Sequence, residues 1–216
     1  MNPVPLILFA LAAYLLGAIP FGFLIARMKG VRIQDVGSGN IGATNVFRCV
    51  GKGWGLLTFF CDALKGFLAA FALPALLERT LGIPSSEGLA ATGALLAVIG
   101  HNWPVFLGFK GGKGVATSAG ALLGVAQLPV AVALGVWLLV FFAIRYVSVA
   151  SMLAAVSAAA TALWMHLDGR YGLLIPVMLT ALAGLTVWRH RGNIQRLREG
   201  TEHRIQFRKP RKASGG

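Results

Sequence analysis

The sequence predicts an all-α protein that crosses a membrane several times, and three observations lead to this prediction. Of the 216 residues, 56% are hydrophobic and only 12% carry a charged side chain, which is about half the charged share of an ordinary soluble domain. Long apolar runs recur along the whole chain. Because these runs are continuous and rich in Ala and Leu, they favour helices over the alternating strands of a membrane barrel.

Seven apolar runs are expected to form transmembrane helices in a single domain over residues 1–200. The runs are residues 5–27, 53–77, 88–109, 115–127, 129–144, 148–166 and 171–188. Pro20 is expected to kink the first run. The fourth run rises only about 20 Å as a helix, so it should tilt or stop short within a hydrocarbon core of about 30 Å. Residues 201–216 are expected to form a basic cytoplasmic tail with a disordered end.

The distribution of basic residues predicts the orientation of these helices. With seven spans, 17 of the 20 Lys and Arg residues fall on one side of the membrane and two, Arg79 and Arg170, on the other. Loops rich in Lys and Arg remain in the cytoplasm, so we expect the N-terminus outside and the C-terminus inside. Membrane topology and anionic lipid therefore account for the net charge of +13, and we expect no nucleic-acid partner.

A glycine segment (residues 110–114) separates the third and fourth runs. It consists of Lys110, Gly111, Gly112, Lys113 and Gly114. Glycine lets backbone N–H groups approach a ligand closely, and N–H groups at the start of a following helix favour an anion. We therefore predict a phosphate-binding segment, although its spacing is not that of a P-loop. The alternative is a flexible basic turn that only fixes topology, which would need the lysines but not the glycines.

A first polar cluster (residues 37–48) occupies the loop after the first span. Small polar side chains and an arginine alternate with glycines there, namely Ser38, Asn40, Thr44, Asn45 and Arg48. The small side chains offer neutral hydrogen-bonding groups, and the arginine offers a planar fork suited to phosphate. Asn and Ser also form ordinary turns, but twelve consecutive residues with this many glycines and small polar side chains, ending in an arginine, favour a ligand site.

A second polar cluster (residues 190–202) follows the last span. His190, Asn193 and Arg196 recur there at the i, i+3 spacing of one helical face. A basic helix beside a membrane is often a lipid-surface anchor, but the histidine and asparagine favour a site. His101, upstream of the glycine segment, alone would more often be structural. All these polar stretches are expected at the cytoplasmic face, so the ligand should be phosphorylated or doubly anionic and reached beside lipid.

Two charged residues, Asp62 and Lys65, lie inside the second apolar run. A charge at the centre of a membrane helix costs about 2.5–3.5 kcal/mol, so such residues usually face the protein interior. Their i, i+3 spacing predicts a structural ion pair, and the alternative is a substrate contact by Lys65. The cysteines match no metal or redox spacing, and we expect neither a metal nor a cofactor.

Three stretches of the chain resemble the motifs of the bacterial acyl-phosphate:glycerol-3-phosphate acyltransferase (PlsY) family. They are GSGNIGATNVFR (37–48), GHNWPVFLGFKGGKGVAT (100–117) and HRGNIQRLREGTE (190–202). The family usually has Pro where Ile41 stands, and we expect only a small change in loop stiffness. The resemblance implies a seven-helix, N-out enzyme of the bacterial inner membrane with a cytoplasmic active site. It would transfer a fatty acyl group from acyl phosphate to the sn-1 hydroxyl of glycerol 3-phosphate, giving lysophosphatidic acid and phosphate.

The resemblance also implies roles for individual residues. Ser38 and Arg48 would serve catalysis and substrate positioning, and His190 and Asn193 would lie near the reacting centre. The phosphate-binding residues would be Gly111, Gly112, Lys113 and Gly114, with further substrate contacts expected from Asn40, Thr44, Asn45, His101 and Lys110. Glu202 would give structural support, as would Asp62 and Lys65 in our interpretation. The upstream enzyme that forms acyl phosphate is a candidate partner.

The expected chemistry needs no covalent acyl-enzyme, because an acyl phosphate is already activated. The sequence has no His-x4-Asp motif, since Phe106 and Gln195 stand at the positions where an acid would follow His101 and His190. Positioning and charge stabilisation then carry catalysis, and the hydroxyl proton passes to the substrate phosphate or to His190, with His101 a further alternative. A transporter for a phosphorylated metabolite and a non-catalytic lipid-binding scaffold are the competing functions. The transporter would need a polar path to the far side, which is poor in polar residues.

Overall fold

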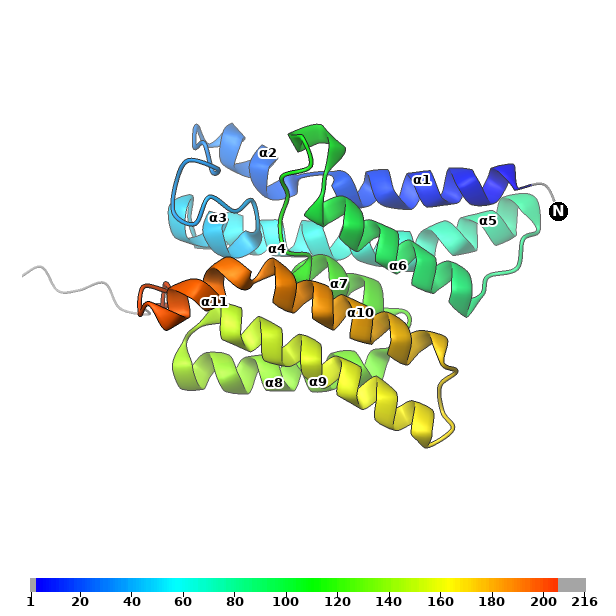
Figure 1. The fold of residues 1–216 in the computed structure, drawn as a ribbon. Helices are drawn as coiled ribbons and strands as arrows, with labels where there is room; N and C mark the ends of the chain where they lie inside the picture. The colour runs from blue at the N-terminus through cyan, green and yellow to red at the C-terminus, as the bar shows by residue number, and fades with distance from the viewer. Residues whose placement is uncertain (1–2, 206–216) are drawn as a thin grey trace, which may run out of the picture.

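The computed structural model describes residues 3–205, and within that range the chain is helical without β-strands. Figure 1 shows the long helices side by side, with short helices and loops gathered at the ends of the bundle. In chain order the elements are α1 (Val4–Ala18), α2 (Phe21–Met28), α3 (Ala43–Cys49), α4 (Lys52–Phe67), the π-helix η1 (Leu68–Ala72), α5 (Leu73–Leu81), α6 (Glu87–Asn102), the 3-10 turn η2 (Val105–Leu107), α7 (Val115–Leu123), α8 (Gln127–Ile144), α9 (Val147–Leu167), α10 (Leu174–Arg189) and α11 (Arg191–Arg198).

Among the described residues, five helical segments are long and apolar enough to cross a membrane. They are Val4–Met28, Lys52–Leu81, Glu87–Leu107, Gln127–Ile144 and Val147–Leu167. The other two predicted spans coincide with α10, which has 16 residues, and α7, which has only nine. The all-helical class is therefore confirmed, whereas the number of seven spans stays a prediction.

The first segment breaks where the sequence predicted a kink. Pro20 has no N–H to continue the helical pattern, so α1 ends at Ala18 and α2 begins at Phe21. Lys65 Nζ donates a hydrogen bond to the carbonyl of Ile19 at the break, 2.8 Å away, and lies 2.9 Å from Asp62 Oδ1. The buried lysine thus has the ionic partner expected from the sequence and also bonds the Ile19 carbonyl at the bend, which accepts from the Phe21 N–H as well.

The short helix α7 lies in the middle of the bundle. Figure 1 shows α1, α5 and α6 on one side of it and α8, α9 and α10 on the other. Close packing against α4 is possible because Gly66 and Gly120 lack side chains; a Cβ at either position would overlap the backbone of the facing helix. The interior beside α7 is built largely of small side chains, such as Ala94, Ala121 and Ala162.

Several helix boundaries differ from those expected, and the end of α6 and the presence of α3 are the largest differences. The third apolar run was expected to continue to residue 109, but α6 ends at Asn102 because Pro104 cannot continue it and disfavours a helical Trp103. The cluster over residues 37–48 was expected as a loop, yet it contains α3. Figure 1 shows α3 and α11 at one end of the bundle, opposite the start of α1, and the loop before α7 beside the break between α1 and α2.

Candidate active site

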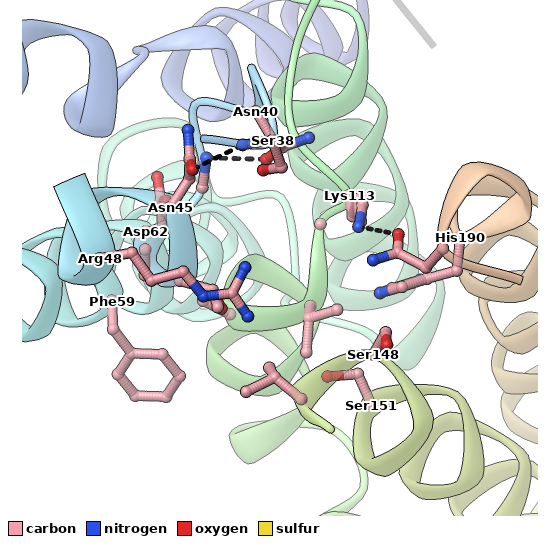
Figure 2. A pocket seen from close by; sticks show the side chains of 18 of the residues that line it. Ser38, Asn40, Asn45, Arg48, Phe59, Asp62, Lys113, Ser148, Ser151 and His190 are labelled. Atoms are coloured by element: carbon pink, nitrogen blue, oxygen red, sulfur yellow. Dashed lines mark hydrogen bonds between the residues drawn. The ribbon is translucent and has the colours of Figure 1, made fainter. Parts of the chain in front are cut away.

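One pocket at that end of the bundle is lined by residues from all three polar stretches. The lining residues predicted from the sequence are Ser38, Asn40, Thr44, Asn45, Arg48, Asp62, His101, Lys113, Gly114, His190, Asn193 and Glu202. Figure 2 shows how their side chains converge from α3, from the loop before α7 and from the α10–α11 junction. Residues separated by more than 150 positions in sequence are therefore brought to one place.

The first polar cluster is held in shape by Asn45. The side-chain Nδ2 of this buried residue donates to the carbonyls of Ile33 and Val36 at 3.2 and 3.1 Å, and its Oδ1 accepts from the Ser38 N–H at 3.0 Å. Asn40 Oδ1 likewise accepts from the Gly42 N–H at 2.8 Å, directly before α3. Asn45 also lines the pocket, and its amide fixes the loop that presents Ser38; its predicted contact with substrate stays a prediction.

Arg48 extends from α3 into the pocket, as Figure 2 shows. Its Nη2 donates to the carbonyl of His203 at 3.1 Å. The segment after α11 therefore reaches back across the pocket and holds one edge of the guanidinium. Burial lowers the pKa of Arg48 from its ordinary value, and nearby Glu202 partly opposes this effect. The side chain can still present other N–H groups to an anion.

The glycine segment packs tightly on His101. Gly112 N–H donates to the His101 carbonyl at 3.0 Å, and a Cβ on Gly112 would overlap the imidazole ring. Gly114 adopts φ +77° and caps α7, a conformation that favours glycine. Because Gly114, Val115 and Ala116 line the pocket, the positive end of the α7 dipole faces it.

Part of the predicted phosphate-binding set lies outside the pocket. Gly111 and Gly112 lie behind its lining, and Lys110 is exposed on the surface. Lys110 follows Gly108 and Phe109, both at positive φ, in a turn closed by the bond from the Lys110 N–H to the Leu107 carbonyl. Lys110 thus belongs to this exposed turn, whereas Lys113, three residues later, lines the pocket.

Glu202 connects the second polar cluster to the rest of the site. Its Oε1 accepts from Asn193 Nδ2 at 2.6 Å and from Ser148 Oγ at 2.8 Å, and its Oε2 lies 2.9 Å from Arg196 Nε. Asn193 Oδ1 in turn accepts a short hydrogen bond from Lys113 Nζ (Figure 2). A continuous chain of polar contacts thus runs from the carboxylate to the ammonium group in the pocket.

Burial tunes the titration of these groups. It lowers the pKa of Lys113 to about 8, an effect strengthened by neighbouring arginines and opposed by Glu202. Burial and the Lys113 ammonium lower the pKa of His190 to about 4, so its imidazole is neutral at pH 7. Burial acts to raise the pKa of Glu202, but the hydrogen bonds from Asn193, Ser148 and Arg196 outweigh it and leave the pKa lowered.

A buried polar group lies beneath the pocket. His101 Nδ1 is 3.5 Å from Asp62 Oδ1, and Lys65 approaches the same oxygen. All three side chains are almost completely buried, and Lys65 does not line the pocket. The predicted ion pair is therefore present, and its histidine neighbour directly supports Gly112.

Several lining residues were not singled out from the sequence. Phe59, Trp137, Val147, Ser148 and Ser151 line the pocket from α4, α8 and α9, and Trp137 Nε1 donates to Ser151 Oγ at 3.2 Å. Ser148 and Ser151 could have been identified from the sequence, because they form an i, i+3 pair of polar residues at one end of an apolar run. Phe59 and Trp137 could not be identified in this way, because in the sequence they resemble ordinary lipid-facing residues. They provide an apolar wall beside the cationic groups.

The helical membrane fold and this pocket define an integral membrane protein that can bind an anion beside an apolar surface. The model of the family "Glycerol-3-phosphate acyltransferase" matches residues 7–200. The chain is 47% identical over 194 residues to the glycerol-3-phosphate acyltransferase of Aquifex aeolicus (strain VF5), covering 89% of this chain and 95% of that protein. It is also 47% identical over 197 residues to that of Geotalea daltonii, covering 91% and 96%.

Solved structures agree with these sequence relationships. The fold matches the crystal structure of PlsY, an integral membrane glycerol 3-phosphate acyltransferase, in its glycerol 3-phosphate form, with a TM-score of 0.80 and 43% identity over 93% of this chain and 95% of that chain. The lysophosphatidic acid form matches with a TM-score of 0.77 and 42% identity over the same shares. The chain therefore belongs to the glycerol-3-phosphate acyltransferase family, as the three motifs predicted.

Proposed function

We propose that this protein transfers a fatty acyl group from acyl phosphate to the sn-1 hydroxyl of glycerol 3-phosphate, releasing lysophosphatidic acid and phosphate. The observation that carries this proposal is the convergence of Arg48, Lys113 and the α7 N-terminus on one pocket with an apolar wall. The similar PlsY structures were solved with glycerol 3-phosphate and with lysophosphatidic acid, which fit a substrate and a product of this reaction.

The cationic groups offset the repulsion between two phosphates, one on each substrate. A hydrogen bond to a charged group contributes about 1.5–3 kcal/mol, so several are needed to hold both phosphates close together. Arg48 and Lys113 supply side-chain donors, and the first N–H groups of α7 supply backbone donors. Ser38, Asn40 and Thr44 add neutral hydrogen-bonding groups, and Glu202 already has its own partners.

The reaction is a direct transfer. The sn-1 hydroxyl oxygen attacks the acyl carbonyl carbon, a new ester C–O bond forms, and the bond from that carbon to the phosphate oxygen breaks. The electron pair leaves with the phosphate, and the cationic pocket stabilises the charge that develops on it. No covalent bond between the protein and the acyl group is required, since the mixed anhydride is already activated.

His190 orients the attacking hydroxyl. Its Nδ1 lies 2.8 Å from the carbonyl of Thr186, which can only accept, so Nδ1 carries the proton and Nε2 keeps a lone pair. That lone pair accepts a hydrogen bond from the hydroxyl. Because the pKa of His190 is about 4, its imidazole is a weak base. The phosphate oxygen released from the acyl carbon gains a full negative charge as its bond breaks, so the departing phosphate is the better final acceptor of the proton.

The protein sits in the bacterial inner membrane with seven spans, the N-terminus outside and the pocket at the cytoplasmic face. The pocket end of the bundle carries α3, α11 and most of the basic residues, and the other end carries the start of α1 (Figure 1), as the positive-inside rule requires. The acyl tail leaves along the wall of Phe59 and Trp137 toward lipid. Residues 1–200 act as one domain, and the enzyme that makes acyl phosphate is a candidate partner at the cytoplasmic face.

The test uses purified protein in detergent or nanodiscs, given acyl phosphate and radiolabelled glycerol 3-phosphate in the presence of EDTA. Lysophosphatidic acid and phosphate should form in equal amounts without coenzyme A or acyl carrier protein. Parallel reactions with acyl-coenzyme A and with acyl carrier protein thioesters test the donor. A monodisperse, folded preparation that forms product only from a thioester, or forms none, contradicts the proposal.

A further inference from the structure

Arg189, the last residue of α10, contacts the glycine segment although it does not line the pocket. Its Nε donates to the carbonyl of Gly112 at 3.0 Å. Its Nη2 donates to the carbonyls of Gly111 and Gly112 at 3.0 and 2.5 Å. One planar guanidinium thus binds two successive backbone carbonyls, a pattern that a lysine ammonium on a flexible stem does not reproduce.

Two tryptophans hold the guanidinium in place. It lies 5.4 Å from the centre of the Trp103 ring and 6.0 Å from that of Trp188, and the two ring centres are 6.0 Å apart. Cation–π contacts of this kind favour a fixed position for the arginine. Trp103 also directly follows α6, so the arginine ties the end of α6 and the end of α10 to the loop between α6 and α7.

The direction of these carbonyls decides what the segment can bind. In a trans peptide the N–H of the next residue points away from the carbonyl, and the described residues contain no cis peptide. With its carbonyls turned to Arg189, the segment therefore directs the N–H groups of Gly112 and Lys113 the other way. The first meets the His101 carbonyl at 3.0 Å. Lys113 itself lines the pocket.

We propose that Arg189 is a positioning residue for phosphate binding, an inference that rests on the proposed function. By binding the carbonyls of Gly111 and Gly112, it keeps two partial negative charges away from the pocket and fixes the backbone that carries Lys113. A segment without this restraint can rotate a carbonyl toward a bound phosphate, which would repel it. Arg189 acts from behind the segment and touches neither substrate.

Arg189→Ala and Arg191→Ala provide a matched comparison, since both remove one arginine at the α10–α11 junction. Arg191 lies 4.3 Å from the centre of the Trp188 ring and bonds the Trp188 carbonyl, outside the glycine segment. Arg189→Ala should raise the KM for glycerol 3-phosphate about 10-fold, equivalent to about 1.4 kcal/mol, while kcat changes less. Arg191→Ala should leave the KM within about twofold, as for a surface charge.

Arg189→Lys separates geometry from charge. It keeps the positive charge beside the tryptophans but loses the fork, so its KM should fall between those of the wild type and Arg189→Ala. Calorimetric titration with glycerol 3-phosphate should give the same order of Kd values without turnover. In a Gly112→Ala, Arg189→Ala double variant the two KM effects should be less than multiplicative, because both act on the same backbone.

Three results would overturn the role of Arg189: an unchanged KM and Kd in Arg189→Ala, equal shifts in Arg189→Ala and Arg191→Ala, or a wild-type KM in Arg189→Lys. If Arg189→Ala fails to fold, the comparison of Arg189→Lys with Arg191→Lys decides the question in the same way. Failure of the wild-type protein to make lysophosphatidic acid would contradict the proposed function, whereas the binding titrations test Arg189 separately.

Discussion

Arg48 binds in two directions, since its guanidinium faces the pocket while Nη2 bonds the His203 carbonyl at 3.1 Å. A lysine cannot make both contacts, because it lacks the planar fork. Arg48→Lys should therefore lower kcat/KM about 100-fold, within the range expected for loss of hydrogen bonds to charged groups, while the protein folds normally. Steady-state kinetics and a thermal melt of the purified variant check this. Retained activity would mean that Arg48 acts only as a diffuse positive charge.

Gly112 tests the packing beneath the pocket. An added Cβ would overlap the His101 ring, which is buried against Asp62 and has little room to move. Gly112→Ala should therefore displace the glycine segment and raise the KM for glycerol 3-phosphate more than it lowers kcat. Gly184→Ala is a control, since a Cβ there meets nothing within 4 Å, and its kinetics should match the wild type. An unchanged KM in Gly112→Ala would contradict the role of the segment.

At the scale of single residues, the sequence predicted which kinds of side chain form the site, but it did not predict where each of them points. Lys110 and Lys113 carry the same charge in the same segment, but Lys110 belongs to the exposed turn with Gly108 and Phe109, and only Lys113 lines the pocket. Asn45 was expected to bind substrate, and its amide is used by the loop. These outcomes depend on backbone turns and hydrogen-bond partners, which residue type and spacing do not specify.

The segment over residues 201–205, here called the strap, joins elements that are far apart in sequence. Glu202 binds Ser148 of α9 and Asn193 and Arg196 of α11, and the His203 carbonyl binds Arg48 of α3. The strap continues to the end of α8, where the Ile205 N–H donates to the Arg145 carbonyl at 3.0 Å and Arg204 Nε to the Ile144 carbonyl at 2.9 Å. It thereby fixes the outer edge of the pocket.

Glu202→Gln should weaken both the fold and the site. The change removes the negative charge that stabilises Arg196. It also replaces one carboxylate oxygen by an NH2 group, which cannot accept a hydrogen bond from the donor that faces it. Ser148→Ala removes only one of the hydrogen bonds to the same carboxylate, so it should cost about 1.5–3 kcal/mol and leave more activity than Glu202→Gln. Thermal melts and specific activities of both variants in one detergent test this order. Equal effects, or a larger effect of Ser148→Ala, would contradict the central position of Glu202.

At the scale of elements, hydrophobic runs located the helices but not their irregular parts. The break at Pro20 was predicted because proline has no N–H to donate. The π-helix η1 was not predicted. It lies just before Pro74, which cannot donate to the Ala70 carbonyl, and the Leu73 N–H bonds the Leu68 carbonyl in the wider π pattern. The short helix α3 was not predicted either, because the Gly, Ser and Asn residues in and before it are typical of turns.

At the scale of the whole molecule, the pocket lies where charge and apolar surface meet. The long helices bury few of their large side chains, and Phe60, Leu139 and Leu167 are exposed, as expected for surfaces that face lipid. The basic side chains at the pocket end attract anionic substrates and the anionic lipid surface alike. The proposed function uses this arrangement, since it needs a phosphorylated soluble substrate and a lipid-soluble substrate to meet in one place.

The proton balance of the pocket gives a pH prediction for the whole enzyme. In the proposed mechanism Lys113 binds phosphate only while protonated, and burial lowers its pKa to about 8. The kcat/KM for glycerol 3-phosphate should therefore decline above about pH 8, approaching a tenfold loss per pH unit. The neutral form of His190, with a pKa of about 4, is maintained throughout this range. Glycerol 3-phosphate is already a dianion above about pH 7, since the second pKa of a phosphate monoester is about 6. The decline in kcat/KM above about pH 8 should therefore reflect a group on the protein and not the substrate.

Lys113→Arg should shift this decline to higher pH, because the guanidinium keeps its charge up to a pKa of about 12. Lys110→Arg is the matched control, since Lys110 is exposed and outside the pocket, and its pH profile should match the wild type. The test measures kcat/KM and Kd for both variants from about pH 6 to about pH 10, a range that brackets the Lys113 pKa of about 8. An alkaline decline at the wild-type pH in Lys113→Arg would assign the titration to a group other than Lys113.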